Sequence, residues 1–150
     1  MEEDWRRIDV DQFDPESQFV EDDLGLPSYT LEDLQGKFQQ IRQSIASNNI
    51  AEGIKLSVTD APYGSANDVK QSYLLAVLEV LNTAKQSEVN TVISQLSTEE
   101  VDVLVKIVYA LMATSEGQRS GGALLGWLDK IVDSVGEGPI VRYLSDPYRI

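Results

Sequence analysis

From residue 30 onward, apolar residues recur at intervals of three and four positions, between residues that typically begin or end helices. The first such stretch carries Leu31, Leu34, Phe38, Ile41 and Ile45. Residues with this spacing lie on one face of an α-helix. Thr30, followed three residues later by Asp33, matches the capping pattern that starts a helix. The sequence therefore predicts an all-α fold, which excludes most architectures at once.

The same pattern returns in six more segments, so we expect about seven short helices. These segments fall near residues 50–58, 67–84, 87–96, 98–112, 124–135 and 138–144. The segment 98–112 is apolar on nearly every face and follows a full capping box, Ser97 with Glu100, which predicts a central, buried helix. Residues 116–122 are rich in Gly and are predicted to form a loop or a loose helix start. Short connections favour a compact bundle, with a short α-solenoid as the alternative.

The N-terminal segment differs from the rest of the chain in its charge. Residues 1–23 hold ten acids and two bases, a net charge of −8 within a whole-chain charge of −13. Such a segment repels itself and buries too little apolar surface to fold alone. It is either a solubilising tail or a strap that orders on a partner, using its interspersed apolar residues as anchors. We expect residues 1–29 to be an extended acidic strap and linker, and residues 30–150 to be a helical domain.

Composition excludes several classes of function. The chain has no Cys and no His, which rules out disulfides, zinc–thiolate sites and catalysis by Ser–His or Cys–His pairs. An excess of acids opposes binding to nucleic acid or to anionic membranes. No stretch of about 18 apolar residues is present, and the acidic start is unlike a secretory signal, which predicts a cytoplasmic protein. We expect no metal and no cofactor.

Three motifs invite a catalytic interpretation, and each has a structural alternative. Glu99 and Glu100 form a carboxylate pair, but Glu100 is better explained as the capping partner of Ser97. Lys106 is either a nucleophile with a depressed pKa or a lysine whose stem lies along the core. Gly121-Gly122 lacks the Lys-Ser/Thr of a phosphate-binding loop. We therefore predict a binding protein, not an enzyme, with Trp127 as a core residue or an interface anchor.

Several stretches together resemble one known family. They are Asp4–Asp14 (DWRRIDVDQFD), Asp102–Tyr109 (DVLVKIVY), Leu124–Lys130 (LLGWLDK) and the closing residues 136–144. In order, spacing and total length they resemble subunit 5, the 16-kDa subunit, of the actin-related protein 2/3 complex. The Trp-Arg-Arg start and the length resemble fungal members more than animal ones.

The resemblance implies a non-catalytic, all-helical structural subunit of an assembly that nucleates branched actin filaments, in the cytoplasm at actin patches or cortical actin. It implies that the helical body docks on subunit 4 and on the β-propeller subunit 1, and that the strap holds actin-related protein 2. The strap positions that it names are Trp5, Arg6, Arg7, Ile8, Val10 and Phe13. On the body it names Trp127, Ile140, Arg142 and Tyr143 as docking candidates, each of which is alternatively core or solvated surface.

The alternative from another functional class is a free-standing helical adaptor, which binds one amphipathic helix in a groove without belonging to a stable complex. The size of the native particle distinguishes this adaptor from a subunit of a hetero-oligomer.

Overall fold

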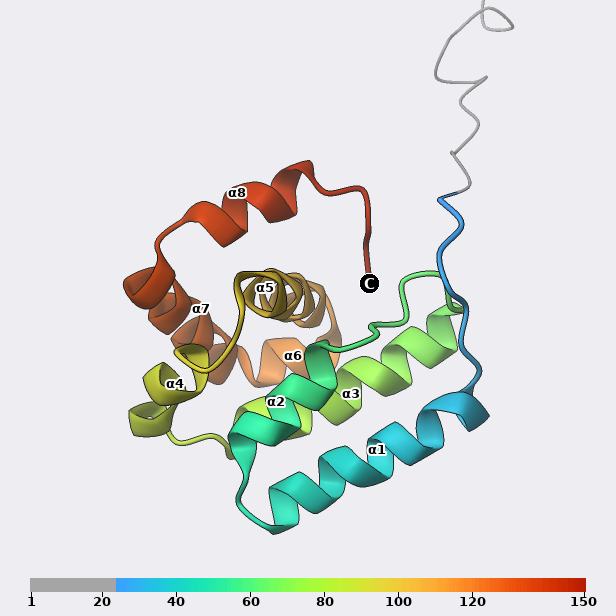
Figure 1. Cartoon of the computed structure of the whole chain (residues 1–150), viewed down its shortest axis with the longest axis horizontal. Coiled ribbons are helices and arrows are strands. Elements are labelled where there is room, and N and C mark those ends of the chain that lie inside the picture. Colours follow the sequence, from blue (N-terminus) through green and yellow to red (C-terminus); the bar gives the residue numbers. More distant parts are fainter. Residues whose placement is uncertain (1–23) are drawn as a thin grey trace, which may run out of the picture.

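The computed structural model of the chain describes residues 24–150, and all regular structure in them is helical (Figure 1). The eight helices are α1 (Leu31–Ala46), α2 (Ile50–Val58), α3 (Asn67–Thr83), α4 (Gln86–Ile93), α5 (Thr98–Met112), α6 (Ser115–Arg119), α7 (Gly121–Val135) and α8 (Gly138–Ser145). The all-α prediction is confirmed. The strap positions Trp5 to Phe13 lie outside the described residues.

Helix α5 lies at the centre, as its sequence predicts. Figure 1 shows it nearly end on, with the other helices around it, and it packs against α2, α3, α6, α7 and α8. Its side chains are buried on most sides, including Val101, Leu104, Val105, Ile107, Val108 and Leu111. This arrangement around one central helix is the compact bundle, not the solenoid alternative.

The two predicted capping boxes are present and begin α1 and α5. The Thr30 backbone N–H donates to Asp33 Oδ2 at 2.8 Å, and the Asp33 N–H donates to Thr30 Oγ1 at 3.2 Å. The Ser97 N–H donates to Glu100 Oε2 at 2.7 Å, and the Glu100 N–H donates to Ser97 Oγ at 3.2 Å. These bonds pair backbone donors that the first turn of a helix leaves free. Glu100 is thus a capping residue, as the structural interpretation of the Glu99–Glu100 pair requires.

Helix α6 is the element that the seven-helix prediction lacks. It occupies residues for which the sequence predicts a loop or a loose helix start, and it is a single turn capped by Thr114, whose Oγ1 accepts from the Gly117 N–H at 3.0 Å. A Cβ at Gly117 would lie 1.9 Å from the Leu111 carbonyl oxygen, so only Gly permits this close turn after α5. The glycines in this stretch are the reason that the sequence predicts a loop. One of them, Gly117, is what allows the chain to turn sharply from α5 toward α7.

Within residues 24–150, no helix combines the length and apolar character needed to cross a membrane.

Candidate functional site

The segment that joins the strap to the body is held against the loop between α2 and α3. The Tyr29 backbone N–H donates to the Oγ of Ser65, a buried residue, at 2.8 Å. Leu26 lies over Gly64 so closely that a Cβ there would meet the Leu26 carbonyl oxygen at 2.7 Å. These contacts place the segment before α1 beside the α2–α3 loop, along the right-hand side of Figure 1.

Trp127, one of the four docking candidates on the body, lies in the core. Its side chain is 0% exposed, and the indole Nε1–H donates to the Leu81 carbonyl oxygen of α3 at 3.0 Å. Of the two interpretations of this residue, the structure shows the core residue. A buried indole with its polar N–H paired joins α7 to α3 and offers no side-chain surface to a partner.

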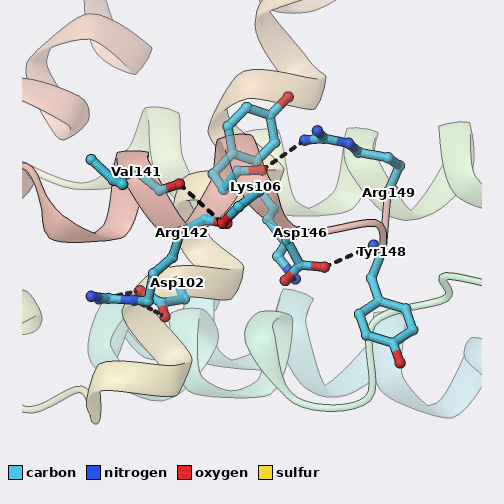
Figure 2. A network of polar contacts seen from close by, with 9 residues as sticks. Asp102, Lys106, Val141, Arg142, Asp146, Tyr148 and Arg149 are labelled. Atoms are coloured by element: carbon cyan, nitrogen blue, oxygen red, sulfur yellow. Dashed lines mark hydrogen bonds and ion pairs between the residues drawn. The ribbon is translucent and has the colours of Figure 1, made fainter.

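Arg142 and Tyr143, two further candidates, contact α5 within the chain. The Arg142 guanidinium donates to both carboxylate oxygens of Asp102, from Nε at 2.6 Å and from Nη2 at 2.7 Å (Figure 2). This pairing favours the charged guanidinium and raises the pKa of Arg142. The Tyr143 ring stacks on Tyr109, with ring centroids 4.6 Å apart and planes 5° from parallel. Both side chains therefore hold α8 on α5.

Lys106 continues the same stripe of α5, one turn after Asp102. Its side chain is nearly buried, and Nζ lies 2.6 Å from Asp146 Oδ2 just beyond the end of α8. The ammonium also lies over the rings of Tyr63 and Tyr148, at 5.1 and 5.8 Å from their centroids. A lysine held by a carboxylate and two aromatic rings is a structural group with its stem in the core, not a free nucleophile.

The C-terminal residues fold back on this network (Figure 2). The Tyr148 N–H donates to Asp146 Oδ1 at 2.7 Å, and Arg149 Nη1 donates to the Tyr143 carbonyl oxygen at 3.1 Å. Burial by itself raises the pKa of Asp146, but the hydrogen bonds from Lys106 and from the Tyr148 N–H outweigh it, so the pKa lies below its ordinary value. We name the set Asp102, Lys106, Tyr109, Arg142, Tyr143 and Asp146 the α5–α8 clamp.

The clamp was not identified from the sequence, although its three residues on α5 follow a recognisable pattern. Asp102, Lys106 and Tyr109 are spaced by four and three residues along an otherwise apolar helix. Polar residues at that spacing share one face, which indicates a polar partner packed against it. Their partners follow about 40 residues later, and nothing local in the sequence connects the two sets.

Ile140, the fourth body candidate, is the one that borders an open apolar surface. It is half-buried and lines a groove of about 550 Å³ between α7 and α8. The other lining residues are Leu125, Gly126, Leu128, Asp129 and Val132 of α7. We name this set the α7–α8 groove. It holds no arrangement of nucleophile and base, so its chemistry is that of a binding surface.

Comparison with known proteins agrees with the resemblance seen in the sequence. The family model of the ARP2/3 complex 16 kDa subunit (p16-Arc) matches residues 4–150. Actin-related protein 2/3 complex subunit 5 of Saccharomyces cerevisiae is 42% identical over 151 aligned residues, which cover 97% of each chain. A probable subunit 5 of Caenorhabditis elegans is 30% identical over 75% of this chain and 77% of its own. Subunit 5-B of Xenopus laevis is 27% identical over 94% of this chain and 91% of its own.

Proposed function

The chain belongs to the family of the 16 kDa subunit of the ARP2/3 complex (p16-Arc), and from this membership we propose that it is a structural subunit of such a complex. The observation that carries the proposal is the extent of the match, because residues 4–150 include most of the acidic N-terminal segment and all of the helices that the structure describes. The family is one of non-catalytic subunits. The proposed setting is the cytoplasmic actin cytoskeleton, at actin patches or cortical actin.

The proposed division of labour follows the two regions of the chain. Residues 30–150 form the body, which docks on subunit 4 and on the β-propeller subunit 1. Residues 1–29 form the strap and linker, which tether actin-related protein 2 and thereby support branched nucleation. A strap of 23 residues reaches up to about 75 Å at roughly 3.3 Å per residue. A tether of this kind acts by raising the effective concentration of the tethered subunit.

In the strap, the apolar residues provide affinity for the partner and the basic residues orient the strap on it. Trp5, Ile8, Val10 and Phe13 are apolar anchors of the kind that carries most of the binding free energy at an interface. Arg6 and Arg7 are the two bases among ten acids, and they orient the strap on an acidic actin-like surface. The contacts of Tyr29 and Leu26 with the α2–α3 loop support the tether, because they join the described start of the chain firmly to the body.

Deleting residues 1–23 is expected to leave the body in the complex but to lower the retention of actin-related protein 2 by about tenfold or more on dilution. Branched nucleation by the purified complex should slow with it. Subunit ratios after gel filtration, together with branch density in a microscopic actin assay, measure both effects. Trp5→Ala with Phe13→Ala should reproduce most of the loss, whereas Glu2→Gln with Glu3→Gln, a matched control, should not. Unchanged retention and branching after the deletion would refute the tether.

A free-standing adaptor is the second candidate function, and the open α7–α8 groove is the observation that favours it. Such an adaptor would bind one amphipathic helix there and would exist as a small particle. The complex subunit is the better supported proposal, because the family match extends far beyond the helices that form the groove.

A further inference from the structure

The α7–α8 groove has the dimensions of a helix-binding surface. Its α7 wall carries Leu125, Leu128 and Val132, spaced by three and four residues, so these side chains form one stripe about 10 Å long at 1.5 Å per residue. Ile140 of α8 forms the opposite side. Two turns of a partner helix match that length, and such helices insert apolar side chains at the same three- and four-residue spacing.

The three most exposed large apolar side chains within residues 24–150 belong to the two helices that form this groove. Leu125 is 59% exposed, and Val141 and Leu144 of α8, at 62% and 70%, are the most exposed large apolar side chains within residues 24–150. Leu144 follows Ile140 by one turn and extends the same stripe of α8. Val141 points away from the α5–α8 clamp in Figure 2. Because the clamp holds the opposite side of α8 on α5, these apolar side chains are presented outward on a fixed helix.

The charged residue that lines the groove is acidic. It is Asp129, which is exposed, and Asp133 follows it by one turn on the same helix. Lys130 lies 3.8 Å from Asp133, and the charge of Arg142 is met by Asp102. No ion pair involves Asp129 within the described part of the chain, so this carboxylate leaves negative charge at the edge of an apolar surface.

This charge decides between possible occupants. Residues 1–23 of the same chain carry a net charge of −8, and a second copy carries −13, so both would be repelled by an acidic residue in the groove. A partner with basic residues next to an apolar face meets both features of the groove.

We infer that the α7–α8 groove binds an amphipathic helix of another subunit, with an apolar face flanked by Lys or Arg. This inference rests on the proposed function, since it places that helix inside the complex. The apolar side chains of the helix cover Leu125, Val132 and Leu144, and its basic residues face Asp129. The α5–α8 clamp contributes by holding α8, and therefore one wall of the groove, in place.

A competition experiment in the intact complex tests the apolar part. Cells of the source organism express an untagged full-length chain together with a tagged variant, and complexes are isolated through the β-propeller subunit. Leu125→Gln with Leu144→Gln should enter the complex about tenfold less than the tagged parent chain. Leu75→Gln, which replaces a half-exposed leucine on α3, should enter equally well. Equal helix content and equal melting of the purified variants confirm that the body is intact.

The role of the acidic residue in the groove is tested by a second variant with its own matched control. Asp129→Lys should lower incorporation several-fold and should weaken its dependence on salt, because it removes an attraction to basic residues. Glu79→Lys makes the same change at another exposed acid in the middle of a helix and should do neither. A photo-reactive amino acid at position 144 should cross-link to a helix of another subunit that carries Lys or Arg beside its apolar face.

The outcomes separate the two proposals. Normal incorporation of the groove variants, or cross-links to residues 1–23, to a second copy or to an acidic segment, would overturn the groove assignment while leaving the chain a subunit of the complex. Failure of every version of the chain, the parent included, to enter any such complex would overturn the proposed function itself.

Discussion

Replacing Trp127 with alanine should lower the free energy of unfolding of the body by about 3–5 kcal/mol, the range for removing a fully buried large aromatic side chain. Trp127 has no exposed surface, and its Nε1–H donates to the Leu81 carbonyl oxygen of α3. Removing it leaves both a cavity between α3 and α7 and an unpaired carbonyl oxygen. Urea denaturation of the full-length chain, followed by circular dichroism, measures the change.

Replacing Trp127 with phenylalanine separates the cost of the cavity from the cost of the lost hydrogen bond. Trp127→Phe keeps much of the volume but removes the donor to Leu81, so its cost should be smaller, about 1–3 kcal/mol. A cost below about 1 kcal/mol for the alanine variant would contradict the placement of Trp127 in the core. It would return Trp127 to the docking surface, the other interpretation that the sequence leaves open.

Replacing Asp146 with asparagine should destabilise the body by about 2 kcal/mol, because it leaves the Lys106 ammonium without its carboxylate. Lys106 is only 8% exposed, whereas Asp146 is more accessible to water. Breaking a buried ion pair costs about 3–5 kcal/mol, and the partial exposure of this pair reduces that figure. Lys106→Met should cost less, since the remaining carboxylate is better solvated. Urea denaturation of both variants gives the comparison.

The double variant provides the control. Lys106→Met with Asp146→Asn removes both charges, so it should be more stable than Asp146→Asn alone, and the coupling between the sites is read from a double-mutant cycle. Additive effects without coupling would contradict a direct ion pair.

Lowering the pH should reproduce part of the stability loss expected for Asp146→Asn, because it protonates the Asp146 carboxylate. The pKa of Asp146 is lowered in the folded chain, so its stabilising contribution is complete above its ordinary pKa of about 4 and disappears as pH falls through the lower folded value. The protection factors of the α8 amides against hydrogen exchange, which are corrected for the intrinsic exchange rate at each pH, should therefore fall below about pH 4. That fall should be much weaker in Asp146→Asn.

The sequence predicts the helices well because the information for them is local. Thr30 with Asp33, and Ser97 with Glu100, begin α1 and α5 through bonds between residues three apart. The apolar character of residues 98–112 likewise predicts the central position of α5. Helix α6 escapes this reasoning, because its fit depends on how closely Gly117 approaches Leu111, a feature of packing that periodicity does not record.

The candidate site is less predictable because it depends on which side of α8 faces α5. Ile140, Val141, Arg142 and Leu144 all belong to one short amphipathic stretch. The contacts of Arg142 with Asp102 show that Arg142 is turned toward α5, and the high exposure of Val141 and Leu144 shows that they point outward. The family resemblance names Arg142 and Tyr143 as docking candidates, and only the structure shows that their side chains also contact α5.

These features give the body a simple mechanical design. Helix α5 packs against α2, α3, α6, α7 and α8, Trp127 joins α7 to α3, and the clamp holds α8 on α5. A rigid body of this kind keeps residue 24, where the described chain begins, at a fixed distance from the α7–α8 groove. If the strap and the groove bind partners as proposed, a fixed separation between them lets one subunit hold two neighbours without performing chemistry.

The most direct test of this account is the size and composition of the native particle that contains the full-length chain. Purification from source cells at low salt, followed by mass photometry and identification of the subunits, gives both. The account predicts a particle of several subunits that includes actin-related proteins in equal ratio to this chain. A monomer of 16.6 kDa without actin-related proteins would contradict it.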